Sequence, residues 1–291
     1  MRVKSFAKIN LGLEVIGKRD DDYHDLRTLL QAVDFHDTLT FEALSSDLIA
    51  LKGNDPSIPW DRRNLVYRAA AALKERFRVA EGIDIFVDKN IPAGRGLGGG
   101  SSNAAMTLYA LNKVWSLHAD KRELAEIGQT LGVDVPYFLE GGLCLGTGRG
   151  DELSLLEDLE PLPCVLVIPD MTILTSTVYE QLPPLTSRSK DSKIIKFLDS
   201  HDFGLLENSL EETVFNLNPQ LKDIKRLLYK LGSELSLLCG SGSAIFGLFR
   251  KKGTAVFACE RLKKRYSLRL VTTLSRAQYW DGVEGWGVAK R

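Results

Sequence analysis

The sequence predicts a protein of two domains in which helices and strands are mixed. The chain has 291 residues, which is long enough to bury more than one hydrophobic core. Strand-like and helix-like patterns occur in both halves, and the segment Pro161-Leu162-Pro163 interrupts them just before an apolar run at residues 164–168. We therefore place the domain boundary near residue 160, which divides the chain into residues 1–160 and 161–291.

The first half is expected to begin with a half-buried strand at residues 3–16, where apolar residues alternate with other side chains. Further strands are expected at residues 39–43, 48–52 and 83–88. Asn64 is expected to cap a helix, because the apolar residues after it repeat on one helix face. Asp120 is expected to cap a second helix, which ends at Gly132.

The second half is expected to alternate helices with strands. Helices are expected at residues 175–182, 192–198 and 218–231, and strands at residues 244–249 and 268–273. The polar run at residues 187–192 is expected to be a surface loop. The tail, residues 277–291, contains Tyr279, Trp280 and Trp286. It has no assigned role, and it either covers a surface or joins a dimer.

The composition disfavours several classes of partner. Lys plus Arg and Asp plus Glu both total 38, so the chain has no electrostatic footprint for nucleic acid or an anionic membrane. The four cysteines form no CxxC pair, which argues against a zinc site or a disulfide framework. No stretch approaches the apolar length of a signal peptide or a membrane span. We expect a soluble cytoplasmic protein with reduced thiols.

The strongest motif is a glycine-rich loop between a predicted strand and a predicted helix. Five of the seven residues at 94–100 are glycine. The backbone N–H groups of such a loop and the N-terminus of the following helix can converge on a phosphate group. The predicted phosphate cradle consists of Pro92, Ala93, Gly94, Arg95, Gly96, Leu97, Gly98, Gly99, Gly100, Ser101 and Ser102.

Three better-known phosphate-binding loops do not fit this motif. A Walker A loop ends in Gly-Lys-Ser/Thr, and this loop has no lysine there. Gly94, Gly96 and Gly99 match the spacing of a dinucleotide-binding loop, but the helix after them is followed by another predicted helix. The protein-kinase loop is followed by a strand, and its accompanying motifs are missing. A purely structural glycine loop stays open as an alternative.

Three motifs, in order along the chain, resemble those of the GHMP kinases, which include galactokinase, homoserine kinase, mevalonate kinase and phosphomevalonate kinase. They lie at residues 7–11 (Ala-Lys-Ile-Asn-Leu), 92–103 and 239–244 (Cys-Gly-Ser-Gly-Ser-Ala). The resemblance implies that the chain phosphorylates a small molecule with ATP. It also implies an α+β fold, with an ATP-binding N-terminal domain like ribosomal protein S5 domain 2 and a ferredoxin-like C-terminal domain.

Three further stretches, residues 8–13, 22–26 and 132–138, resemble one branch of this superfamily. Its kinases phosphorylate the 2-hydroxyl of 4-diphosphocytidyl-2-C-methyl-D-erythritol in the non-mevalonate route to isoprenoid precursors. The chain departs from the family pattern at Phe6, Asp22 and Arg95, where proline, glycine and a small residue are usual. None of these departures removes a chemical group that phosphoryl transfer needs.

Asp134 is the candidate for the group that accepts the hydroxyl proton, because a carboxylate at the start of a short helix has a fixed position. Spacing alone leaves a simple N-cap role equally open. The resemblance implies that Lys8 lies near Asp134 and keeps it ionised. Taken alone, a strand lysine is more often a solvated charge. Asn10 shares a strand face with Lys8 and would hydrogen-bond the substrate.

The resemblance assigns four residues to the nucleotide end of the substrate. Tyr23 and Tyr179 match positions that sandwich the cytosine ring, a task suited to flat aromatic faces. His24 and Arg149 match positions that bind the cytosine edge or neighbouring polar groups. Taken alone, Tyr23 would be a half-buried packing residue and His24 a surface histidine.

Gly240 and Ser241 would bring small residues and N–H donors to the substrate diphosphate, although a plain hairpin turn fits the same residues. Mg²⁺ is expected with ATP because it neutralises the β and γ oxygens. Ser102 is a candidate to approach this ion, and no carboxylate ligand is identified. Two other functions stay open, namely a different GHMP kinase and a catalytically silent protein of the same fold.

Overall fold

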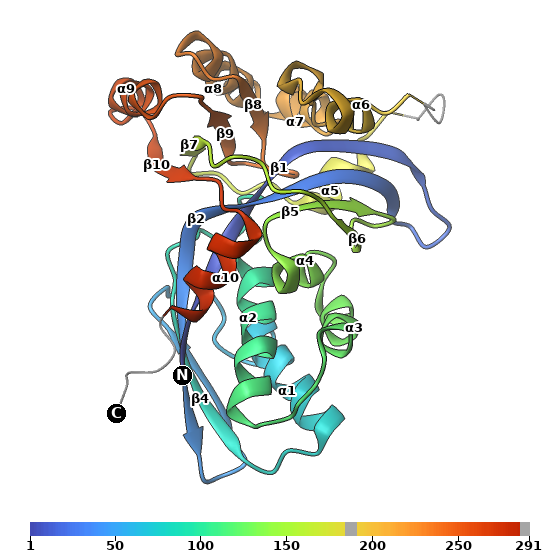
Figure 1. Cartoon of the computed structure of the whole chain (residues 1–291), viewed down its shortest axis with the longest axis vertical. Helices are drawn as coiled ribbons and strands as arrows, with labels where there is room; N and C mark the ends of the chain where they lie inside the picture. Colours follow the sequence, from blue (N-terminus) through green and yellow to red (C-terminus); the bar gives the residue numbers. More distant parts are fainter. Residues whose placement is uncertain (184–190, 286–291) are drawn as a thin grey trace.

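The protein is built on two β-sheets with helices packed against them, and the computed structural model describes residues 1–183 and 191–285 (Figure 1). Within these residues the first sheet has the order β3-β4-β2-β5-β6, with β1 paired to β2, and the second has the order β10-β7-β9-β8. The strands of the first sheet are β1 (Arg2–Lys18), β2 (His24–Leu44), β3 (Ile49–Gly53), β4 (Gly82–Asp88), β5 (Leu143–Thr147) and β6 (Glu152–Leu155). The strands of the second sheet are β7 (Pro163–Ile168), β8 (Leu235–Leu238), β9 (Ile245–Leu248) and β10 (Ser267–Thr272).

Strand β1 connects the two halves of the molecule. It is buried continuously from Ser5 to Leu13, so the prediction of a half-buried strand is wrong over this stretch. The reason is that its two faces meet different partners. Phe6 packs in the cluster that contains the helices of the first half, whereas Ile9 and Leu11 pack in a cluster with residues of the second sheet.

Four helices cover the first sheet, and their starts follow from the sequence. They are α1 (Leu65–Phe77), α2 (Gly99–Val114), α3 (Lys121–Leu131) and α4 (Val135–Glu140). The predicted caps are confirmed, because the Asn64 side chain accepts from the Val66 N–H and the Asp120 side chain accepts from the Glu123 N–H. Gly132 ends α3 as expected.

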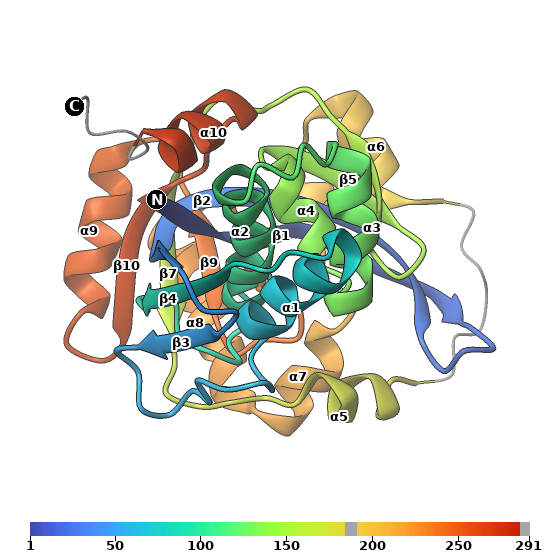
Figure 2. The same cartoon turned by 90° about the horizontal axis from the view of Figure 1, so that it is seen from below.

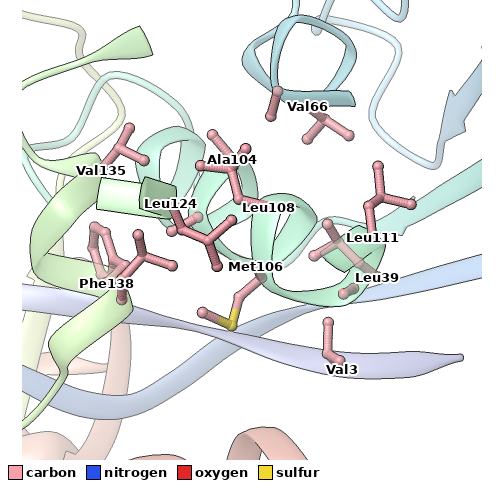
Figure 3. Packing of buried hydrophobic residues seen from close by; sticks show 14 of the residues in the cluster. Val3, Leu39, Val66, Ala104, Met106, Leu108, Leu111, Leu124, Val135 and Phe138 are labelled. Atoms are coloured by element: carbon pink, nitrogen blue, oxygen red, sulfur yellow. The ribbon is translucent and has the colours of Figure 1, made fainter. Parts of the chain in front are cut away.

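Helix α2 forms the centre of the first hydrophobic cluster. Its residues Met106 and Leu108 lie between Val66 of α1, Phe138 of α4 and the strand residue Val3 (Figure 3). All five side chains are buried. The packing fixes the two ends of α2 relative to the sheet, including the end that begins in the glycine-rich loop.

The second half carries five helices and one 3₁₀ turn among the described residues before its last strand. They are α5 (Thr175–Glu180), α6 (Lys193–Ser200), η1 (Phe203–Leu205), α7 (Glu211–Leu217), α8 (Pro219–Lys230) and α9 (Lys252–Leu262). The predicted helices at residues 175–182, 192–198 and 218–231 are confirmed with small shifts at their ends. Helices α7 and α9 and strands β5 and β6 were not predicted. Of the predicted surface loop, residues 187–190 lie outside the described residues, and Ser192 caps α6.

The C-terminal helix α10 (Arg276–Glu284) crosses from the second sheet back to the first half (Figures 1 and 2). Tyr279 and Val283 are fully buried there and belong to the same cluster as α2 and α4. Trp286, the last aromatic residue of the tail, lies outside the described residues. The division near residue 160 stays a prediction, to which the structure adds that α10 packs with the first half.

All four cysteines are free thiols, and none lies in an activating environment. Burial raises the pKa of Cys144 to about 11 and that of Cys239 to about 12, so both thiols stay protonated at neutral pH. In the described ranges, no helix has the length and apolar character needed to cross a membrane.

Candidate active site

A cavity of about 480 Å³ opens between the two halves, a size typical of small-molecule sites. Its walls come from β1, the β1–β2 connection, β2, the glycine-rich loop, the start of α4, the β5–β6 connection, α5 and the β8–β9 connection. Eleven of the predicted site residues line it: Lys8, Asn10, Tyr23, His24, Gly96, Gly98, Asp134, Arg149, Tyr179, Gly240 and Ser241.

One group of neighbouring cavity residues, which we call the reacting end, consists of Lys8, Asn10 and Asp134. The Lys8 Nζ atom donates a hydrogen bond to Asn10 Oδ1 at 2.8 Å and lies 3.5 Å from Asp134 Oδ2. The Lys8 side chain is only 5% exposed, whereas that of Asp134 is 33% exposed. The cation is therefore held in place by two oxygen atoms, while the carboxylate keeps a face open to the cavity.

Asp134 occupies the N-cap position of α4, but its side chain makes no capping hydrogen bond. Its backbone is helical there (φ −84°, ψ −11°), and Pro136 lies in the first turn of α4. Asp134 thus has the N-cap position that the alternative predicted, but its carboxylate does not act as a cap. The carboxylate is directed to Lys8 instead.

Asn10 is itself fixed by a short chain of hydrogen bonds. Its Nδ2 atom donates to Thr28 Oγ1 at 2.9 Å, and the Thr28 hydroxyl donates to the Gly12 carbonyl at 2.9 Å. Asn10 and Thr28 are both buried. These hydrogen bonds leave the side-chain oxygen Oδ1 of Asn10 directed to Lys8. The position of the Lys8 amine therefore follows from the pairing of β1 with β2.

The glycine-rich loop reaches the cavity through Gly96 and Gly98. Both have positive φ (76° and 71°), a region that side chains disfavour. Their close neighbours explain the requirement further: a Cβ on Gly96 would lie 1.9 Å from the Cys239 carbonyl oxygen, and one on Gly98 would lie 2.7 Å from the Phe138 ring. Gly98 directly precedes α2, whose first N–H groups have no partner within the helix.

The other residues of the predicted cradle do not line the cavity. Leu97 is buried, and its carbonyl accepts from the Lys8 N–H at 3.0 Å. Arg95 turns away and pairs with Asp170 at 3.2 Å. Ser102 is fully buried and accepts a hydrogen bond from the Ser5 hydroxyl at 2.7 Å. Its hydroxyl therefore does not face the cavity, and the expectation that it approaches a metal ion is not met by this geometry.

A second group of cavity residues, which we call the base end, consists of Tyr23, His24, Arg149 and Tyr179. The His24 and Tyr179 rings lie 5.0 Å apart with a tilt of 33°, and the Arg149 guanidinium lies 5.2 Å from the centre of the Tyr23 ring. Arg149 is oriented by an ion pair with Asp151 at 2.6 Å. The ring of Tyr23 is 52% exposed. The structure thus brings together four residues from three separate segments.

Two of these groups are neutral at physiological pH. Burial, and to a lesser extent the charge of Lys18, lowers the pKa of His24 below its ordinary 6.5. Burial, with a contribution from the charge of Asp134, raises the pKa of Tyr179. A neutral imidazole has one donor and one acceptor nitrogen, which suits the mixed hydrogen-bonding edge of a nucleobase.

The β8–β9 connection is both a hairpin turn and a wall of the cavity, so the two alternatives for Gly240 and Ser241 are compatible. A Cβ on Gly240 would lie 3.6 Å from Lys8 Nζ. Ser241 Oγ lies 2.8 Å from Thr175 Oγ1 on α5. Asn208 fixes the loop from below, because its Nδ2 atom donates to the Leu238 and Gly240 carbonyls at 2.9 and 2.8 Å.

A buried ion pair beneath the glycine-rich loop was not predicted. Lys89 Nζ lies 2.6 Å from Asp37 Oδ2, and these side chains are 5% and 0% exposed. The other Asp37 oxygen accepts from the N–H groups of Asn90 and Ile91, each at 2.7 Å. The pair fixes the backbone just before Pro92. A signal existed in the sequence, since Lys89 follows a strand and precedes the loop, but its partner on β2 was not apparent.

The geometry of the glycine-rich loop fits ATP, and the ligands of a metal ion would come mainly from the phosphate groups of ATP. The positive-φ glycines and the start of α2 form a surface that has no room for side chains. A phosphate cradle requires such a surface, because the phosphate must approach the backbone N–H groups closely. Among the described residues, no group of three or more His, Cys, Asp or Glu side chains is arranged to hold a metal ion. Mg²⁺ in kinase sites is bound mainly by phosphate oxygens, water and one or two carboxylates, which this site can accommodate.

Comparison with known proteins gives the same family as the resemblance of the sequence motifs. The model of the GHMP kinases N terminal domain matches residues 64–142, and that of the GHMP kinases C terminal domain matches residues 194–268. The chain is 36% identical to a 4-diphosphocytidyl-2-C-methyl-D-erythritol kinase of Clostridioides difficile, covering 95% of this chain and 96% of that protein. It is 39% identical to the enzyme of the same name from Thermodesulfovibrio yellowstonii, covering 93% and 97%.

Solved structures agree. A crystal structure of 4-(cytidine 5'-diphospho)-2C-methyl-D-erythritol kinase matches with a TM-score of 0.82 and 36% identity, covering 94% of this chain and 99% of the other. A homoserine kinase from Cytophaga hutchinsonii matches with a TM-score of 0.72 but only 18% identity, covering 94% and 95% of the two chains, and shows the shared fold alone.

The two domain matches and the fold define a small-molecule kinase of the α+β GHMP class, as the sequence predicted, and such kinases take their phosphoryl group from ATP. Within that class, the chain belongs to the family of 4-diphosphocytidyl-2-C-methyl-D-erythritol kinases.

Proposed function

We propose that the protein transfers the γ-phosphoryl group of ATP to the 2-hydroxyl of 4-diphosphocytidyl-2-C-methyl-D-erythritol. The observation that carries this proposal is that one cavity is lined both by a lysine–aspartate pair and by aromatic and polar side chains. The lysine–aspartate pair suits proton transfer from an alcohol, and the aromatic and polar side chains suit binding of a pyrimidine ring.

At the reacting end, Asp134 accepts the proton of the 2-hydroxyl as the oxygen attacks the γ-phosphorus. The bond between the γ-phosphorus and the β–γ bridging oxygen breaks, and ADP leaves with that electron pair. The Lys8 amine lies 3.5 Å from Asp134 Oδ2 and places its positive charge beside the carboxylate. Asn10 holds the amine there and offers its amide to the substrate.

We assign the remaining substrate groups to the cavity residues that the family resemblance indicates. Gly96, Gly98 and the start of α2 receive the ATP phosphates, and bound Mg²⁺ would supply charge neutralisation on the β and γ oxygens. Gly240 lies next to Lys8, and Gly240 and Ser241 receive the diphosphate of the cytidyl substrate. Tyr23 and Tyr179 enclose the cytosine ring, while His24 and Arg149 bind its edge and neighbouring polar groups. A cytoplasmic location stays a prediction.

The experiment is an ADP-release assay with a panel of acceptors. The panel consists of the cytidyl alcohol, its uridyl analogue, methylerythritol phosphate without the cytidyl group, homoserine and mevalonate. We expect turnover with the cytidyl alcohol and a large loss of kcat/KM with methylerythritol phosphate, since remote binding energy positions the reacting hydroxyl. Equal activity on the uridyl analogue, or a preference for homoserine or mevalonate, would leave only the kinase class. No ADP release with any acceptor would favour a catalytically silent protein.

A further inference from the structure

The C-terminal helix α10 makes contacts that the proposed chemistry does not use. It begins with a capping box, in which Ser275 Oγ accepts from the Gln278 N–H at 3.2 Å and Gln278 Oε1 accepts from the Ser275 N–H at 3.0 Å. The Arg276 N–H donates to Asp158 at 2.7 Å, and the Arg276 guanidinium donates to the Leu143 carbonyl at 2.8 Å. The helix is therefore anchored firmly where it meets the first half.

From this anchor, two side chains of α10 reach the C-terminal end of α4. The Tyr279 hydroxyl donates to the Phe138 carbonyl at 2.7 Å, and Trp280 Nε1 donates to the Glu140 carbonyl at 3.0 Å. The last four carbonyls of any helix have no partner within it. In α4, which has six residues, those at Phe138 and Glu140 are satisfied by α10.

The same tyrosine also contacts the strand that carries Lys8. The rings of Tyr279 and Phe6 lie 5.4 Å apart, and a Cβ on Gly282 would lie 2.6 Å from the Phe6 ring. Phe6 stands two residues before Lys8 on β1, where the family pattern usually has proline. The tail has no assigned role in that pattern. These two unusual features of the sequence are thus in direct contact in the structure.

Helix α4 is short, and its first turn presents Asp134 to the cavity. A helix of six residues has little stability of its own, so its orientation depends on tertiary contacts. Its outer end is held by Tyr279 and Trp280. Its middle is held by the Phe138 ring, against which Gly98 packs so closely that a Cβ would lie 2.7 Å away.

We propose that α10 is a positioning element of the reacting end, in which Tyr279 and Trp280 hold α4 so that Asp134 stays beside Lys8. This inference rests on the proposed function, because it assumes that Asp134 accepts the proton. Tyr279 does not touch the cavity, and it acts through α4 and β1.

The main test is Tyr279→Phe, which removes only the hydroxyl and keeps the ring against Phe6. We expect kcat to fall about tenfold while both KM values stay within about twofold, because a small displacement of a catalytic group costs rate rather than affinity. The matched control is Tyr109→Phe. Its hydroxyl donates to Glu284 at the far end of α10 at 2.5 Å, and the variant keeps the Tyr109 ring 5.1 Å from that of Trp280, so kcat should not change.

A double-mutant cycle separates positioning from general stability. In an Asp134→Asn background, Tyr279→Phe should no longer lower kcat, because the group that it positions is already gone. An unchanged kcat in Tyr279→Phe, a rise in KM alone, or the same fold loss in both backgrounds overturns the inference. If Tyr279→Phe does not fold, Trp280→Phe is measured in the same cycle. A wild-type kcat in Asp134→Asn itself would instead remove the catalytic role of Asp134, and the inference with it.

Discussion

The two groups of cavity residues, the reacting end and the base end, differ in how firmly their side chains are held. At the reacting end, Lys8 is almost fully buried, bonded to Asn10 and close to Asp134. At the base end, Tyr23 is half exposed and lies beside the guanidinium of Arg149. A pre-organised group lowers the barrier of the chemical step, whereas an exposed ring contributes mainly binding energy. The difference indicates that the reacting end controls kcat and the base end controls KM for the cytidyl substrate.

The largest effect is expected at Asp134. Asp134→Asn should lower kcat by about 10²- to 10⁴-fold, the range for removal of a general base, while KM for both substrates changes little. Steady-state kinetics with the cytidyl alcohol would measure both parameters. Thermal unfolding serves as the control: the variant should stay folded, and the loss of the Lys8 partner should lower the Tm less than loss of a fully buried partner would, because the Asp134 side chain is 33% exposed and caps no helix. Near-normal turnover would contradict the conclusion that the reacting end controls kcat.

The buried ion pair beneath the glycine-rich loop gives the next largest effect. Asp37→Asn would leave the buried Lys89 charge without its partner, and breaking such a pair costs about 3–5 kcal/mol of unfolding free energy. Urea denaturation measures this directly. The control is Asp22→Asn at the base end, whose partner Lys18 is exposed, so its loss should not be detectable. Equal losses in the two variants would contradict the contrast between the buried support of the glycine-rich loop and the exposed pair beside Tyr23.

Tyr23→Ala tests the base end. Loss of stacking on a base is worth about 1–3 kcal/mol, so KM for the cytidyl alcohol should rise about 5- to 150-fold with KM for ATP unchanged. Because Tyr23 is exposed, the folded protein should be as stable as the wild type. A fall in kcat at constant KM would show that the two ends are not separate.

The smallest effect is a pH dependence that comes from His24. Its lowered pKa keeps the imidazole neutral at pH 7, where it has an acceptor nitrogen to offer the base. Below the pKa the ring becomes a cation that only donates. KM for the cytidyl alcohol should therefore be constant at pH values above the ordinary histidine pKa. It should rise as the pH falls through the lowered pKa of His24. His24→Gln should remove this dependence, and a profile that persists in that variant would assign it elsewhere.

The sequence predicted those parts of the fold that have local causes. Asn64 and Asp120 cap helices through neighbouring N–H groups, and the glycines at 96 and 98 meet backbone constraints that only glycine satisfies. The first part of β2 escaped prediction because Asp34, His36 and Asp37 interrupt its apolar pattern. In the structure Asp37 is buried against Lys89, a partner far away in the chain.

The site follows the same rule. Lys8 and Asn10 lie on one face of a strand, so their proximity could be predicted from local spacing. The approach of Lys8 to Asp134, and that of Tyr179 to His24, depend on contacts between distant segments, so only the family resemblance suggested them. The role of α10 had no local sign, since Tyr279 and Trp280 meet α4 only after the chain returns from the second sheet.

The central claim is that the cavity binds a cytidyl group at an end separate from the chemistry. Calorimetric titration of cytidine diphosphate, with the ATP site saturated by ADP, tests it most directly. The account predicts equal Kd values for the wild type and Asp134→Asn, within about twofold, and a Kd about 5- to 150-fold weaker for Tyr23→Ala. Equal affinity in all three proteins, or uridine diphosphate binding as tightly as cytidine diphosphate, would contradict it.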